Sequence, residues 1–177
     1  MLFSKWLNES SLNDLYQSAV AAFPNTTKRQ HSIDIIRINE INWTPFLGMN
    51  TLFLKGNASN IENGHEYAPM ILFKNVVYHA RRDREEWVEI VANDGRNYVF
   101  ERLGYDANDV LVRCNCPDFQ WRFNFFDHED RSLYGRKRRR YEAIAAPGSA
   151  NPNRMPGMCK HLMQLAATIN NSGILEG

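Results

Sequence analysis

The chain has 177 residues, of which 44% are aliphatic, aromatic or cysteine and 23% are charged. This length and balance are typical of a globular protein that buries a core without disulfides, and they exclude an intrinsically disordered chain. The formal net charge is only +1, so binding to nucleic acid would depend on a local cluster of cations rather than on the field of the whole chain.

The first predicted element is a helix over residues 11–23. Ser11 is placed to cap it, Asp14 occupies the capping-box position, and the apolar residues fall near one face. From residue 32 the pattern changes to β-branched residues. Isoleucines at positions 33, 35, 36 and 38 occupy both faces of a strand, which predicts either burial on both sides or a β-bulge.

Strands rich in β-branched and aromatic residues are predicted next, over residues 51–55, 70–79, 86–92, 97–103 and 110–116. Asn93, Asp94 and Gly95 predict a tight hairpin turn between two of these strands. The mixed charges of residues 81–86 are most simply explained by a solvated hairpin.

The last helix is predicted to begin after Pro156 and Gly157 and to run to about residue 170. Its apolar stripe consists of Leu162, Leu165, Ala166 and Ile169. The fold class that follows is α+β, with one N-terminal helix, an antiparallel β-rich body and a C-terminal helix.

All three cysteines fall in two short motifs, Cys114-Asn115-Cys116 and Cys159-Lys160-His161. Cys114 and Cys116 are two apart on a predicted strand, so their thiols point the same way. Cys159 and His161 open the last helix, whose N-terminus favours a thiolate. Three thiols and one imidazole make a complete tetrahedral ligand set for Zn²⁺ with no open position. We therefore predict a structural zinc site. The alternatives are buried free cysteines, or His128 as a ligand in place of His161.

This pattern resembles the SWIM zinc finger over residues 96–171, because two strands ending in C-x-C are followed by a connection and by C-x-H at the start of a helix. The resemblance implies that Cys114, Cys116, Cys159 and His161 bind one zinc in a ββα unit. It divides the chain into a helix and β body over residues 1–95 and a zinc-binding region over 96–177. Forty-two residues separate Cys116 from Cys159, more than is usual in the family, so the zinc would close a long insertion over residues 117–158.

The insertion contains two candidate partner surfaces. The first is a predicted helix that carries five aromatic residues: Phe119, Phe123 and Phe126 on one face, and Trp121 and Phe125 off it. These aromatic residues either pack against the β body or anchor a partner subunit. The second is a basic run between two tyrosines, which would contact nucleic acid, pair with nearby acids or dock on an acidic neighbour: Tyr134, Arg136, Lys137, Arg138, Arg139, Arg140 and Tyr141.

The predicted function is binding to other molecules rather than catalysis. The four predicted ligands leave no open position on the zinc, and every thiol is better explained as a ligand than as a nucleophile. The whole chain also resembles small virion-associated proteins of tailed bacteriophages, in the stretches NWTPF (42–46), TLFLKG (51–56), 67–78 and MPGMCKH (155–161). We therefore expect a non-catalytic, zinc-stabilised subunit of a phage head, neck or tail that acts through protein–protein contacts. The alternative is a SWIM finger that binds nucleic acid through residues 136–140.

The expected location follows from the cysteines and from the N-terminus. An odd number of cysteines and a C-x-C pair favour reduced, metal-bound thiols, and hence synthesis in a reducing cytoplasm before entry into a virion. The first seven residues do not have the pattern of a signal peptide, and no apolar run approaches the length of a membrane span. Neither a membrane nor a small-molecule substrate is expected as a partner.

Overall fold

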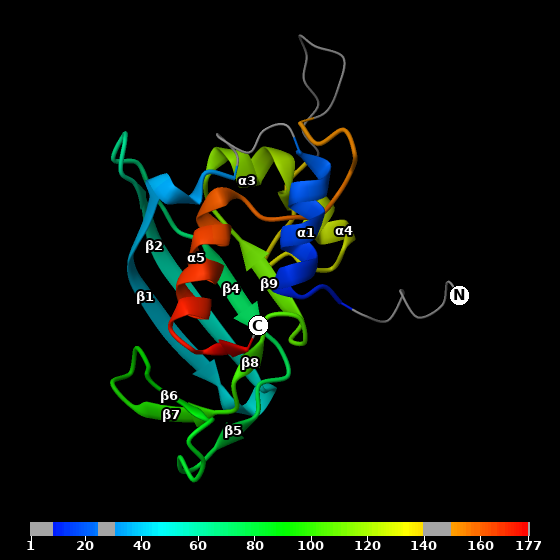
Figure 1. Cartoon of the computed structure of the whole chain (residues 1–177). Helices are drawn as coiled ribbons and strands as arrows, with labels where there is room; N and C mark the ends of the chain where they lie inside the picture. The colour runs from blue at the N-terminus through cyan, green and yellow to red at the C-terminus, as the bar shows by residue number, and fades with distance from the viewer. Residues whose placement is uncertain (1–8, 25–30, 140–149, 177) are drawn as a thin grey trace, which may run out of the picture.

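The centre of the fold is a five-stranded antiparallel sheet with helices on one face (Figure 1). The structure is a computed structural model that describes residues 9–24, 31–139 and 150–176. The sheet has the order β1-β2-β4-β9, with β3 paired to β2. Its strands are β1 (Ile36–Phe46), β2 (Thr51–Asn60), β3 (Glu66–Tyr67), β4 (Met70–Phe73) and β9 (Val110–Arg113). The predicted α+β class with an antiparallel body is confirmed.

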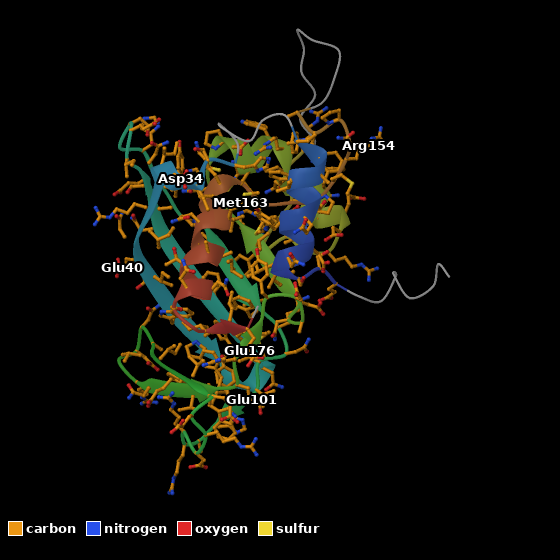
Figure 2. The ribbon with its side chains drawn as sticks, viewed as in Figure 1. Asp34, Glu40, Glu101, Arg154, Met163 and Glu176 are labelled. Atoms are coloured by element: carbon orange, nitrogen blue, oxygen red, sulfur yellow. The ribbon has the colours of Figure 1, made fainter. Side chains whose placement is uncertain are left out.

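Two helices cover this face of the sheet, α1 (Leu12–Ala22) and α5 (Lys160–Asn171). The predicted capping box of α1 is present, because Ser11 Oγ accepts a hydrogen bond from Asp14 N and the Asp14 carboxylate accepts one from Ser11 N. Helix α5 contacts β1 and β2, and its predicted apolar stripe is buried. Met163, which is labelled on this helix in Figure 2, is buried as well. Two short helices, α3 (Pro117–Arg122) and α4 (Asn124–Glu129), follow β9.

The strands of the sheet alternate between a buried face and a partly open one. Ile71 and Phe73 on β4, and Val110 and Val112 on β9, are fully buried beneath the helices, whereas the residues between them are half-buried. On the opposite face, the rings of Phe53 and Tyr134 stack with their centroids 5.0 Å apart. Both faces of the sheet are therefore covered, one by helices and the other in part by the insertion.

A smaller sheet lies beyond the end of the main one (Figure 1). Its order is β5-β7-β6, with β5 (Tyr78–His79), β6 (Val88–Val91) and β7 (Asn97–Phe100). The predicted turn joins β6 to β7, and Gly95 adopts a positive φ of 78° there, which suits glycine. The hairpin predicted over residues 81–86 is wrong, because β5 and β6 both pair with β7 and not with each other. Those residues form an exposed connection across one end of β7.

Strand β1 begins later than its run of isoleucines suggests. A 3₁₀ turn, η2 (Ile33–Ile35), precedes it, and its pairing with β2 shifts by one residue between Ile38 and Glu40. This shift is the bulge that was one of the two predicted explanations. Glu40 lies at the edge of the sheet that β1 forms (Figure 2). A second turn, η3 (Leu47–Met49), leads into β2, which continues five residues beyond its predicted end.

The finer expectation of a ββα zinc-finger unit is not confirmed. Strand β9 pairs with β4, whereas β7 belongs to the smaller sheet and β8 (Leu103–Gly104) pairs in parallel with β10 (Leu175–Glu176). The predicted boundary at residue 95 falls in the turn of the β6–β7 hairpin, and one hydrophobic core draws residues from both sides of it.

Candidate metal centre

The four predicted ligands come together at one end of the molecule, where β9 ends and α3 and α5 begin (Figure 1). Their ligand atoms, one from each side chain, all lie within 4.8 Å of one another. The exposed fractions of Cys114, Cys116, Cys159 and His161 are 0%, 1%, 0% and 2%. We refer to these four residues as the Cys3His cluster. They form a buried group that could hold a metal ion.

Backbone contacts fix the two thiols that follow β9. Cys116 is the N-cap of α3, and its Sγ accepts a hydrogen bond from the backbone N–H of Phe119 at 3.3 Å. The side chain of Gln120 donates to the carbonyl of Cys114 at 2.9 Å. Between the thiols, Asn115 Oδ1 accepts from the N–H of Ala68 at 2.7 Å. The C-x-C motif is thus held both by its own helix and by the link between β3 and β4.

The other two ligands are placed by the start of α5. Cys159 is the N-cap of this helix and His161 lies in its first turn, as predicted. The segment before them is anchored at two points. The backbone N–H of Gly157 donates to Asp127 Oδ1 at 2.7 Å, and Ser18 Oγ donates to the carbonyl of Pro156 at 2.7 Å. The approach to Cys159 is therefore held by both the insertion and α1.

The three thiols differ in the direction of their pKa shifts. Hydrogen bonds from Cys114 and Cys159 lower the pKa of Cys116, so the charged form is favoured at this thiol. Burial raises the pKa values of Cys114 and Cys159. Contact with Cys116 raises the pKa of Cys114 further, and contacts with Cys114 and Cys116 do the same for Cys159. A bound cation would stabilise all three thiolates and would therefore lower the pKa values of Cys114 and Cys159.

His161 has the features of a ligand rather than of a core histidine. Its Nδ1 lies 3.8 Å from Cys159 Sγ, and its buried Nε2 has no hydrogen-bond partner among the described residues. Tyr67 packs against the ring with centroids 4.8 Å apart. The alternative ligand, His128, is exposed, and its Nδ1 lies 3.7 Å from Glu129. The structure thus brings His161, and not His128, to the thiols.

Three of the five insertion aromatics belong to the core. Phe119, Phe123 and Phe126 are buried, and the edge of Phe123 meets the ring of Phe23 at a centroid distance of 5.7 Å. A partner could not reach these three rings without unfolding the insertion, so as partner anchors they are corrected to core residues. Only Trp121, which is 46% exposed, and the half-buried Phe125 stay open to a partner.

The described part of the basic run is exposed, over residues 136–139. The guanidinium of Arg138 lies 5.7 Å from the ring centroid of Trp121, and the ammonium of Lys137 lies 5.9 Å from that of Phe125. Within residues 9–24, 31–139 and 150–176, these four cations form no ion pair with a carboxylate. Tyr134 packs on Phe53 rather than beside them. Arg140 and Tyr141 lie outside the described residues.

Sequence patterns did not indicate two buried ionisable side chains in the insertion, Arg122 and Asp127. Arg122 is buried between the rings of Phe23 and Phe123, at 4.4 and 4.5 Å, and makes two hydrogen bonds to Asp118. Asp127 is fully buried, and this burial raises its pKa. The i,i+4 spacing of Asp118 and Arg122 is a signal that could have been used. Asp127 gives no such signal, because its partner is a backbone N–H thirty residues away.

An open cavity of about 740 Å³ lies against the Cys3His cluster. Its walls include Tyr67, Trp121 and Lys160, and it is also lined by two members of the cluster, Cys116 and His161. Cys114 and Cys159 are not among the described residues that line it. Only part of the cluster therefore borders the solvent-filled space.

No protein family, no curated protein and no solved structure matches this chain. Among the described helices, none combines the length and apolar character that are needed to cross a membrane.

Proposed function

We propose that the Cys3His cluster binds one Zn²⁺ as a structural ion. The observation that carries this proposal is the convergence of three buried thiols and one imidazole, with ligand atoms within 4.8 Å of one another. Two sulfur ligands of a tetrahedral zinc lie about 3.8 Å apart, so these side chains need only small adjustments to fit the ion. Thiolate and imidazole donors favour zinc over the hard cations calcium and magnesium.

The function that we infer is that of a non-catalytic subunit acting through protein–protein contacts. Four protein ligands fill the coordination of zinc and leave no position for a substrate or a reactive water. The ion would tie the C-x-C motif after β9 to the start of α5, and so close the insertion into a fixed structure. The assembly that we propose is a phage virion, as a head, neck or tail component, on the basis of the sequence resemblance alone.

The zinc proposal is tested by elemental analysis of the purified protein. We expect about one zinc per chain. His161→Ala should lose this zinc, whereas the matched variant His128→Ala should keep it, since His128 is exposed and is not a member of the Cys3His cluster. If protein purified under reducing conditions contains no metal, the proposed zinc site is refuted.

The assembly proposal is tested by mass spectrometry of the complexes that the native protein enters. Recovery of the protein in purified virus particles, in fixed proportion to other structural subunits, is the expected result. A protein that is found only free, or only with nucleic acid, would contradict it.

Nucleic-acid binding is a second candidate, which the exposed cations of residues 136–139 favour, because none of them pairs with a carboxylate in the part of the chain that the structure describes. Exposed cations can contact phosphates, and the ring of Trp121 beside Arg138 is an aromatic surface on which a base can stack. The test is a gel shift or fluorescence titration with short single-stranded DNA at two salt concentrations. Changing Arg136, Lys137 and Arg139 to Gln should abolish binding, whereas the same change at three exposed arginines elsewhere should not: Arg37, Arg96 and Arg102. Absence of binding by the unmodified protein would exclude this candidate.

A further inference from the structure

The thiols of the Cys3His cluster differ in their access to solvent. Cys116 lines the open cavity together with Tyr67, Trp121 and Lys160, although only 1% of its surface is exposed. Cys114 and Cys159 have no exposed surface. A molecule as small as a peroxide that enters the cavity would therefore meet Cys116 before the other two thiols.

The sulfur of Cys116 has two thiols within reach, but only one of them suits a disulfide. The ligand atoms lie within 4.8 Å of one another, so a short movement of the side chains brings either sulfur into contact with Cys116. Cys114 is separated from Cys116 by a single residue, and such a short loop strains a disulfide. Cys159 comes from a different segment, the start of α5, and carries no such constraint.

We propose that Cys116 is a site of oxidation by peroxide and that Cys159 completes the reaction, so that a disulfide replaces the metal. This inference rests on the proposed zinc site. The Cys116 thiolate attacks one peroxide oxygen, the O–O bond breaks, and hydroxide leaves to give a sulfenic acid. The Cys159 thiolate then attacks the Cys116 sulfur, the S–O bond breaks, and a second hydroxide leaves. Two thiolates have lost two electrons to one peroxide, and the ion, left with two protein ligands, is released.

The consequence for the fold is that the insertion stays closed in both states. A disulfide between Cys116 and Cys159 joins the ends of the same forty-two-residue segment that zinc would hold. A reducing compartment would favour the metal-bound form and an oxidising one the disulfide form. The molecule would keep its insertion folded when it passes from one environment to the other.

The experiment treats the zinc-loaded wild-type protein with increasing hydrogen peroxide. Released zinc is measured with a chromogenic chelator, and disulfides are mapped by mass spectrometry of peptides prepared without reductant. We expect one zinc to be released for each Cys116–Cys159 disulfide formed, and both changes to be reversed by dithiothreitol and added zinc. Cys114→Ser should still form this disulfide, whereas Cys159→Ser should stop at the sulfenic acid of Cys116, which a dimedone probe detects.

The possible results separate this inference from the zinc proposal. Protein that contains no zinc before treatment contradicts both. Protein that contains zinc, but keeps it in peroxide or forms only a Cys114–Cys116 or Cys114–Cys159 disulfide, overturns the oxidation site and leaves the structural zinc intact.

Discussion

Gly157 lies in a position where even one added methyl group should disturb the core. A Cβ atom at this residue would stand 2.6 Å from Cε1 of Phe123 and 2.8 Å from the Cβ of Ala19. Carbon atoms pack at about 3.5–4.0 Å, so each contact would overlap by roughly 1 Å. Phe123 and Ala19 are both fully buried, so neither can move aside without shifting α1 or the insertion.

We expect Gly157→Ala to lower the free energy of unfolding by about 1–2 kcal/mol. Overpacking of a core costs about 1–3 kcal/mol, and the smaller conformational freedom of alanine in the unfolded chain returns about 0.4–1 kcal/mol. For a chain of this size the loss corresponds to a decrease in Tm of roughly 2–8 °C. Gly157 does not adopt a positive φ, so the backbone adds no further penalty.

The assay is urea unfolding in zinc-containing buffer, followed by tryptophan fluorescence and circular dichroism. Gly48→Ala is the matched control, because a Cβ at Gly48 meets no atom within 4 Å and its φ is also not positive. The control should be unchanged or slightly more stable. If Gly157→Ala is as stable as Gly48→Ala, the proposed contact between the approach to Cys159 and the core is incorrect.

Three further predictions concern protonation and capping. Burial raises the pKa of Asp127, so the contribution of this carboxyl to stability is complete below its unfolded pKa, near 4, and is lost as the pH rises through its folded pKa. Asp127→Asn keeps an oxygen that accepts from the Gly157 N–H. In urea unfolding at pH 8 this variant should therefore be more stable than the wild type, by a margin that shrinks toward pH 5. Cys114 and Cys159 have raised pKa values, and both must lose a proton to bind metal. The apparent zinc affinity, measured by competition with a chelator, should therefore fall about 100-fold for each unit of pH below neutrality. An affinity that does not change with pH would show that these thiols are not ligands. Ser11→Ala removes the cap of α1 and should cost about 1 kcal/mol, visible as a lower Tm, and an unchanged Tm would mean that the capping box adds nothing to stability.

Local signals in the sequence were sufficient for the helices that carry or support the candidate site. Ser11 and Asp14 marked the start of α1, and Pro156 and Gly157 marked the approach to α5. These features depend on neighbours within one helical turn, so an isolated stretch of sequence contains all the information they need. The convergence of the two cysteine motifs was also predictable, since all three cysteines fall within them.

Strand pairing was not predictable, because it depends on segments far apart in the chain. Strand β9 pairs with β4, about forty residues earlier, and the residues of one strand do not indicate that the other is its partner. Strand β2 was predicted to end at residue 55, before Gly56 and Asn57, which disfavour strands. Pairing with β1 and β3 on its two sides extends it to Asn60 in spite of this composition.

The interior of the insertion shows the same limit. Helical spacing predicted one helix with Phe119, Phe123 and Phe126 on one face. The structure instead has two short helices, α3 and α4, with Phe123 between them, and buries all three rings. Spacing alone could not decide whether these rings meet the core or a partner. The core residues that meet these rings come from a distant segment, before β1. Phe23 packs against Phe123, and Ala19 lies beside Gly157, which is next to Phe123. Likewise, Asp127 binds a backbone N–H, and a backbone group has no signature in the amino-acid sequence.

Cys116 and Cys159 are each the first residue before a helix, α3 and α5, and this position links metal binding to local opening of the backbone. The first turn of a helix lacks internal partners for its N–H groups, so it is ordinarily among the first parts to exchange amide hydrogen with solvent. An ion held by both caps would fix both first turns at once. We expect removal of zinc to accelerate amide exchange together at Phe119 and at Leu162–Met163, while the paired amides of β2 and β4 keep their protection.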